Sequence, residues 1–129
     1  MKYEWFIPDR SKKNFYITIS ERWMTFPKRV LKFMNYPDYI KIGVIGNKVI
    51  FHTWSGNKLI PSKEDENAFK VKRGIFGNYT IYSRKLIRFI SSRMINPIFG
   101  KYEIKKHQIN NDEWYNYYIE IDNNPFKEG

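Results

Sequence analysis

Alternation of apolar and polar positions dominates the start of the chain. Residues 14–20 (NFYITIS) alternate as a half-buried strand does, and residues 22–26 (RWMTF) predict a second strand after a tight turn. The period then lengthens, because the apolar residues of segment 27–36 recur at helical spacing, at Val30, Leu31, Phe33 and Met34. Pro27 suits the first position of a helix, and Pro37 ends it. The opening pattern is therefore strand, strand, helix.

A β-hairpin is predicted next. Residues 39–45 (YIKIGVI) and 48–54 (KVIFHTW) are rich in β-branched and aromatic side chains. Gly46 and Asn47 separate them, and both residues tolerate the positive φ of a tight turn.

The polar stretch 61–67 (PSKEDEN) breaks the pattern, and we place a linker at residues 62–67. The order of elements then restarts, with strands at 68–73 and 79–82. Ser83 is a good N-cap for a helix that reaches about Met94. The segments 101–109 and 115–121 are expected to pair as the last two strands.

The same eight-residue pattern occurs in both predicted helices. PKRVLKFM (27–34) and SRKLIRFI (83–90) place basic, apolar and phenylalanine residues in the same slots. Each helix lies between two pairs of strands, which indicates an internal repeat. We expect a strand-rich α+β protein with halves at 1–61 and 68–129 that share one core.

Composition supports this fold class and narrows the cellular setting. The chain of 129 residues has one Ala and three Leu but ten Tyr and ten Phe, a mixture that favours strands. Cysteine is absent, so disulfides and thiolate metal sites are excluded. No apolar run approaches the roughly 20 residues of a membrane helix. We expect a soluble, cytoplasmic protein without a membrane partner.

Charge gives the first indication of function. Lys and Arg number 23 against 13 Asp and Glu, a net charge of +10. Between residues 70 and 106 there are ten basic residues and one acid, Glu103. Such a basic region favours a polyanionic partner, either nucleic acid or an acidic protein surface. A solvated basic face without a ligand is the alternative.

Residues 24–51 (MTFPKRVLKFMNYPDYIKIGVIGNKVIF) resemble the swapped-hairpin domains of AbrB-like and MazE-like DNA-binding proteins. The shared features are an apolar strand that ends in proline, a basic amphipathic helix and an aspartate before a hairpin. They fall here on Phe26, Pro27, Lys28, Arg29, Asp38, Ile40 and Ile42. The duplicated layout is also similar to an uncharacterised family of Firmicutes that occurs near mobile elements.

The resemblance implies a barrel in which two copies of the motif interlock. Family members do this as dimers, whereas here both copies lie on one chain, so it implies a pseudo-two-fold barrel. The family usually has Gly and Arg before the apolar strand, where this chain has Glu21, Arg22 and Trp23. Arg22 is a candidate replacement for that arginine. Pro37 stands where the family has glycine.

The candidate nucleic-acid-binding residues are basic, because phosphate contacts supply most nonspecific affinity. One basic group on each predicted helix would contact the phosphate backbones on either side of a two-fold axis. Residues 12 and 13 would form a basic arm. The full set is Lys28, Arg29, Lys32, Arg84, Lys85, Arg88, Arg22, Lys12 and Lys13.

Exposed aromatic side chains are candidates for stacking on unpaired bases. Trp23, Trp54 and Tyr79 are the best placed of these by pattern. Packing in the core is the alternative, because a chain with so few leucines needs other side chains to fill its interior.

Catalysis, metal binding and cofactors are not expected. His52 and His107 are isolated, and neither belongs to an HExxH pattern. No nucleophile elbow or phosphate-binding loop is present. The consecutive acids at 64–66 are typical of a solvated loop.

Three hypotheses of function follow. The first is a double-stranded DNA-binding regulator, a monomer or a homodimer, with DNA favoured over RNA. The second is a phage or mobile-element protein that inhibits a host defence nuclease, as anti-CRISPR proteins do, by binding the nuclease or its guide RNA. The third is an enzyme of unknown type.

Overall fold

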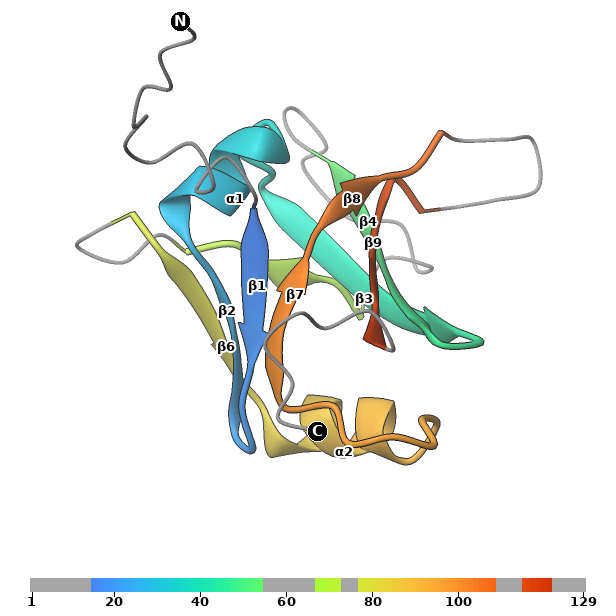
Figure 1. Cartoon of the computed structure of the whole chain (residues 1–129). Helices are drawn as coiled ribbons and strands as arrows, with labels where there is room; N and C mark the ends of the chain where they lie inside the picture. The colour runs from blue at the N-terminus through green and yellow to red at the C-terminus, as the bar shows by residue number, and fades with distance from the viewer. Residues whose placement is uncertain (1–14, 55–66, 73–76, 109–114, 122–129) are drawn as a thin grey trace, which may run out of the picture.

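The computed structural model describes residues 15–54, 67–72, 77–108 and 115–121. It is a mixed α+β fold with two antiparallel sheets and two helices. The four-stranded sheet has the order β6-β2-β1-β7 (Figure 1). Its strands are β1 (Tyr16–Ile19), β2 (Trp23–Phe26), β6 (Tyr79–Tyr82) and β7 (Gly100–Glu103).

The five-stranded sheet has the order β5-β3-β4-β9-β8. Its strands are β3 (Tyr39–Ile45), β4 (Lys48–Trp54), β5 (Phe69–Lys70), β8 (Lys105–Lys106) and β9 (Tyr117–Glu120). Strict alternation makes β4 half-buried: Val49, Phe51 and Thr53 point inward, and the residues between them are less buried. The predicted hairpin at Gly46 and Asn47 is confirmed, with φ of 59° at Gly46.

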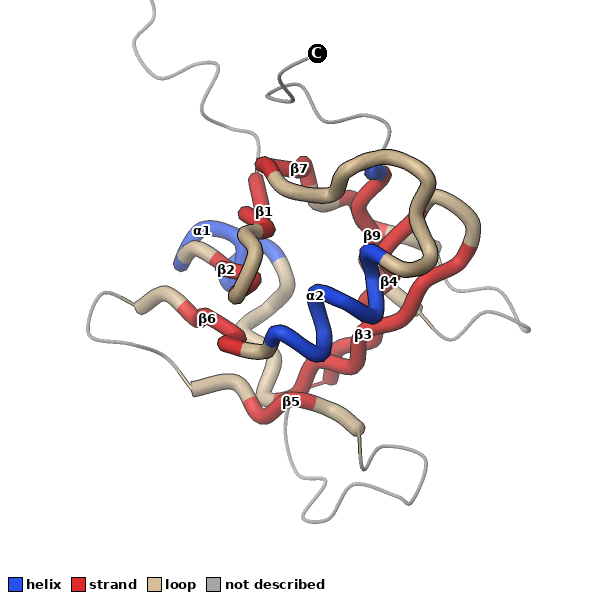
Figure 2. Tube along the Cα trace, turned by 90° about the horizontal axis from the view of Figure 1, so that it is seen from below, coloured by secondary structure: helices blue, strands red, loops and turns tan. Residues whose placement is uncertain are grey.

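Each sheet contains strands from distant parts of the sequence. In the first sheet β2 pairs with β6, and in the second β4 pairs with β9. Figure 2 shows the two sheets facing each other, with α2 (Arg84–Ser91) across the near end. One cluster of buried side chains joins both sheets and both helices. Phe26 of β2 lies near its centre, with its ring 6.0 Å from Tyr79 and 5.8 Å from Phe51.

The two helices lie at opposite ends of the molecule (Figure 1). Helix α1 (Lys28–Phe33) is shorter than the pattern predicts. The chain leaves it through Asn35 and Tyr36, whose φ values of 61° and 49° are incompatible with another right-handed turn. Its buried residues are Val30 and Leu31, followed by Met34, while Phe33 is half-buried.

The predicted N-cap of α2 is confirmed, since Ser83 Oγ accepts a hydrogen bond from the Leu86 amide at 3.1 Å. Leu86, Ile87 and Ile90 are buried. The helix ends at Ser91 rather than near Met94, which is partly buried against the core.

Two predicted strands differ from the structure. Segment 68–73 contributes only β5, which is two residues long. Segment 101–109 is divided into β7 and β8, which belong to different sheets. The division falls at Ile104, which is buried and donates its amide to the Phe15 carbonyl at 2.8 Å. A single periodic pattern does not reveal such a change of sheet, because both pieces are extended. The predicted linker at residues 62–67 lies outside the described residues except for Asn67.

Asn116 extends the junction between β4 and β9. Its Oδ1 accepts from the Thr53 amide at 3.0 Å, and its Nδ2 donates to the Thr53 carbonyl at 3.1 Å and to Thr53 Oγ1 at 3.0 Å. Thr53 is buried, so these polar groups depend on a protein partner.

We therefore predict that Asn116→Ala lowers the free energy of unfolding by about 1–3 kcal/mol, because the buried polar groups of Thr53 lose their partner. Chemical denaturation measures this change. Asn67→Ala, at an exposed position, is the control and should change stability by no more than about 0.5 kcal/mol. Equal effects of the two substitutions would contradict the assignment.

Candidate nucleic-acid interface

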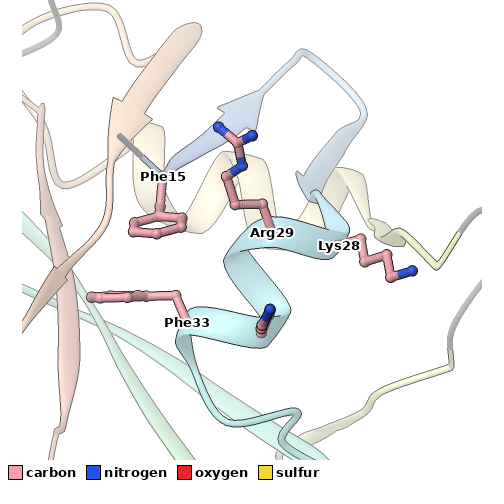
Figure 3. Close-up of a pocket in the computed structure, with 5 residues that line it drawn as sticks. Phe15, Lys28, Arg29 and Phe33 are labelled. Atoms are coloured by element: carbon pink, nitrogen blue, oxygen red, sulfur yellow. The ribbon is translucent and has the colours of Figure 1, made fainter. Parts of the chain in front are cut away.

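The first basic cluster consists of Lys28, Arg29 and Lys32 on α1. All three side chains are exposed and border an open hollow of about 670 Å³. Phe15 and Phe33 form the apolar wall of the hollow, with ring centroids 4.7 Å apart (Figure 3). The cluster thus combines three cations with an apolar surface.

Helix α1 is fixed against the loop that precedes β6. The Lys28 amide donates to Asn78 Oδ1 at 3.1 Å. The stem of Lys28 lies against Gly77, where an added Cβ would come within 3.0 Å of Lys28 Cδ. Gly77 also has a φ of 79°, which other residues rarely adopt. This contact places Lys28 at one end of the β2–β6 ladder.

The second basic cluster consists of Arg22, Arg84 and Arg88. These residues line a hollow of about 380 Å³ together with Glu21, Ile87, Ser91 and Phe99. Arg22 reaches the cluster because its carbonyl accepts from the Ser83 amide at 3.1 Å, at the start of α2. The residue proposed as a replacement for the family's arginine therefore sits with the helix of the other half. Lys85 is exposed on the same helix but does not line the hollow.

These cations are free to take an external partner. None of Arg22, Arg84 and Arg88 forms an ion pair with another residue of the described ranges. Glu21 is the one carboxylate among the residues that line the second hollow. Within the part of the chain that the structure describes, no group of three or more His, Asp or Glu could hold a metal ion.

The β2–β6 ladder lies between the starts of the two helices that carry the clusters. Trp23 is paired with Tyr82, and Thr25 with Thr80, whose hydroxyl oxygens are 3.3 Å apart. The rings of Trp23 and Tyr82 are tilted with centroids 6.2 Å apart, and the side chains are 39% and 79% exposed.

The aromatic predictions have different outcomes. Trp23 is exposed as predicted. The prediction that Tyr79 is exposed is wrong: only 8% of it is accessible, because it faces the core beside Phe26. Trp54 is half-buried and stacks on Tyr39 at 5.4 Å. Sequence reasoning missed Tyr82, although strict alternation from a buried Ile81 places it on the outer face.

The remaining candidates lie apart from this face or outside the described residues. Lys12 and Lys13 fall outside the described ranges. His107 stacks on Tyr115 at 4.1 Å, and His52 lies 5.3 Å from the Trp54 ring; neither histidine lines either hollow. Among the described residues, no helix has the length and apolar character to cross a membrane.

A scan against protein-family models, a search of curated proteins and a search of solved structures each found no match.

The burial of Tyr79 gives a testable pH dependence. Burial raises the pKa of the Tyr79 phenol and that of Tyr117 above the ordinary value of 10.0. Above pH 10 the unfolded chain loses these protons while the folded chain retains them, so stability falls as pH rises. We predict that Tyr79→Phe makes this fall shallower between pH 10 and the raised pKa. Denaturation at several pH values measures it, and Tyr82→Phe, at an exposed position, should leave the slope unchanged.

Proposed function

We propose that this protein binds nucleic acid, with double-stranded DNA as the favoured ligand, through the solvent side of the β2–β6 ladder and the two flanking helices. The observation that supports this most is the position of the two basic clusters. Lys28 begins one helix at one end of the ladder, and Arg84 begins the other helix at the opposite end. Cations at both ends of one face suit a ligand with two charged backbones.

The spacing of the clusters agrees with the dimensions of a duplex. The ladder runs three residue steps from Trp23 to Phe26, roughly 10 Å at the rise of a β-strand, and Lys28 and Arg84 begin the helices two residues beyond its opposite ends. The DNA major groove is about 12 Å wide, and long basic side chains reach the phosphates beyond its edges. One face of a single chain could then contact both strands.

We infer that the chain is an internal duplication with a pseudo-two-fold axis. The axis would exchange β1 with β5, β2 with β6, β3 with the pair β7 and β8, and β4 with β9. This exchange converts the observed pairings into one another. The pairing β1–β7 becomes β5–β3, β3–β4 becomes β8–β9, and β2–β6 and β4–β9 are unchanged. The β1–β2 pairing has no counterpart among the described residues.

Strand registers support the same exchange. Ile40 of β3 pairs with Phe69 of β5. The proposed exchange maps Ile40 to Tyr102 and Phe69 to Ile17, and these two residues also pair. The axis then passes through the β2–β6 ladder at the pair Thr25 and Thr80, between the two basic clusters. This arrangement would let one chain present the two-fold surface that swapped-hairpin proteins form as dimers, and it would suit a regulator that binds a two-fold DNA site.

A second candidate function has one observation in its favour. Exposed apolar side chains are concentrated near α2, where Phe89, Ile95 and Phe99 are accessible. Such a concentration suits a protein partner, including the host nuclease of the phage-inhibitor hypothesis. The basic clusters would then contact an acidic protein surface or a guide RNA.

Removing four charges from the helices tests DNA binding. We predict that the combined substitutions Lys28→Gln, Arg29→Gln, Arg84→Gln and Lys85→Gln weaken binding to a labelled DNA duplex. They should also reduce the slope of log affinity against log salt by about 0.9 for each phosphate that the variant no longer neutralises. Fluorescence anisotropy over a range of salt concentrations measures both quantities.

The matched control removes the same charge from the five-stranded sheet, at Lys41, Lys48, Lys105 and Lys106. It should retain most of the affinity and most of the salt slope. If both variants lose affinity equally, net charge rather than the proposed face governs binding. If the unmodified protein binds neither DNA nor RNA at low salt, the proposed function is wrong.

A further inference from the structure

The two ends of the β2–β6 ladder differ by one residue. On β2 the buried Phe26 is followed by Pro27 alone before α1 begins. On β6 the buried Ile81 is followed by both Tyr82 and Ser83 before α2 begins. Because Thr25 and Thr80 pair directly, Phe26 and Ile81 are the equivalent positions. Tyr82 is therefore an additional residue in the second half.

This additional residue changes the chemistry of the α2 end. Tyr82 pairs with Trp23, and together they form an exposed aromatic pair. The corresponding positions at the α1 end are Pro27 and Asn78, and Asn78 is occupied in capping the Lys28 amide. The two ends therefore differ in exposure: Trp23 and Tyr82 are exposed at the α2 end, whereas the stacked rings of Phe15 and Phe33 beside α1 are half-buried.

The aromatic pair lies next to two of the arginines in the sequence. Arg22 directly precedes Trp23, and Arg84 follows Tyr82 after one residue. Their side chains and that of Arg88 line the same hollow of about 380 Å³, a size within the usual range for small-ligand sites. Guanidinium groups bind phosphate oxygens through paired hydrogen bonds, and exposed aromatic rings stack on unpaired bases.

From these contacts we propose that the α2 end is a binding site for an unpaired nucleotide of a single-stranded segment next to a duplex. It deepens the nucleic-acid binding proposed above and rests on it. A base stacks on Tyr82 and Trp23, and the adjacent phosphates bind Arg22, Arg84 and Arg88. Glu21, the one carboxylate among the described residues that line the hollow, can accept a hydrogen bond from a base amino group. Among the described residues we assign this site to the α2 end alone, because the ladder positions that correspond to Tyr82 and Trp23 at the α1 end are Pro27 and Asn78.

The test compares a blunt duplex, the same duplex with a short single-stranded extension, and free single strands of DNA and RNA. Fluorescence anisotropy measures each affinity. We expect the extension to strengthen binding, and Tyr82→Ala to remove that gain, weakening binding of the extended duplex roughly 5- to 150-fold, as expected for one stacked base. Because Tyr82 also lies on the proposed duplex-binding face, the affinity for the blunt duplex is measured alongside, and the affinity for the extended duplex should fall by the larger factor.

Matched controls come from the α1 end. Tyr36→Ala removes an exposed tyrosine beside α1 and should preserve the preference for the extension. Lys32→Gln and Arg88→Gln remove a cation from the same slot of the two helices, and only the second should reduce the gain from the extension. Trp23→Phe provides an optical readout, since it should remove quenching of tryptophan fluorescence by a bound single strand. Circular dichroism checks that each variant is folded.

The possible results separate the two proposals. If the blunt duplex binds and the extension adds nothing, the nucleotide site is wrong and the proposed function stands. If single strands bind through Tyr82 and the blunt duplex does not bind, the nucleotide site stands and the favoured ligand is wrong. If Tyr82→Ala changes the oligomeric state but no oligonucleotide affinity, the aromatic pair is an interface between copies of the chain, which overturns the nucleotide site.

Discussion

Pairing between β2 and β6 is the constraint on which the rest of the structure depends. These strands are far apart in sequence, and their ladder brings Phe26 against Tyr79, with Phe51 of the other sheet completing the contact. Antiparallel pairing also sets the direction in which each chain segment leaves the ladder. Helix α1 consequently starts at one end and α2 at the other, so the separation of the basic clusters is a result of strand pairing.

Elements with a strong local signal were predictable from the sequence. Alternation gave the hairpin of β3 and β4, and Ser83 marked the start of α2 through its hydroxyl acceptor. The end of α1 was not predictable in the same way, because the left-handed conformation of Asn35 and Tyr36 is only weakly encoded by their side chains. The separation of β7 from β8 was missed because it depends on which strands are nearby, and local alternation carries no such information.

The candidate site shows the same limit. The charges on the helices were predictable, because an amphipathic pattern separates the buried face from the solvated one. Arg22 could not be assigned to a cluster from the sequence, since its place depends on the approach of the β1–β2 turn to Ser83. The burial of Tyr79 depended on strand phase, and an error of one residue exchanges the two faces of a strand. The phase of the alternation along β6 determines that Tyr79 is buried and Tyr82 is exposed to solvent.

The proposed duplication and the asymmetry of its two ends would have different consequences. Equivalent strand pairings maintain one core, so both halves must preserve the buried positions of the ladder. The connection from strand to helix lies outside that core, and an added residue there costs little packing while it turns Tyr82 toward solvent beside Trp23. In a dimer of identical chains the same insertion would occur at both ends of the face. A duplication within one chain, as proposed above, would allow the two ends to differ. The α2 end has the exposed aromatic pair, and the α1 end has the stacked, half-buried rings of Phe15 and Phe33.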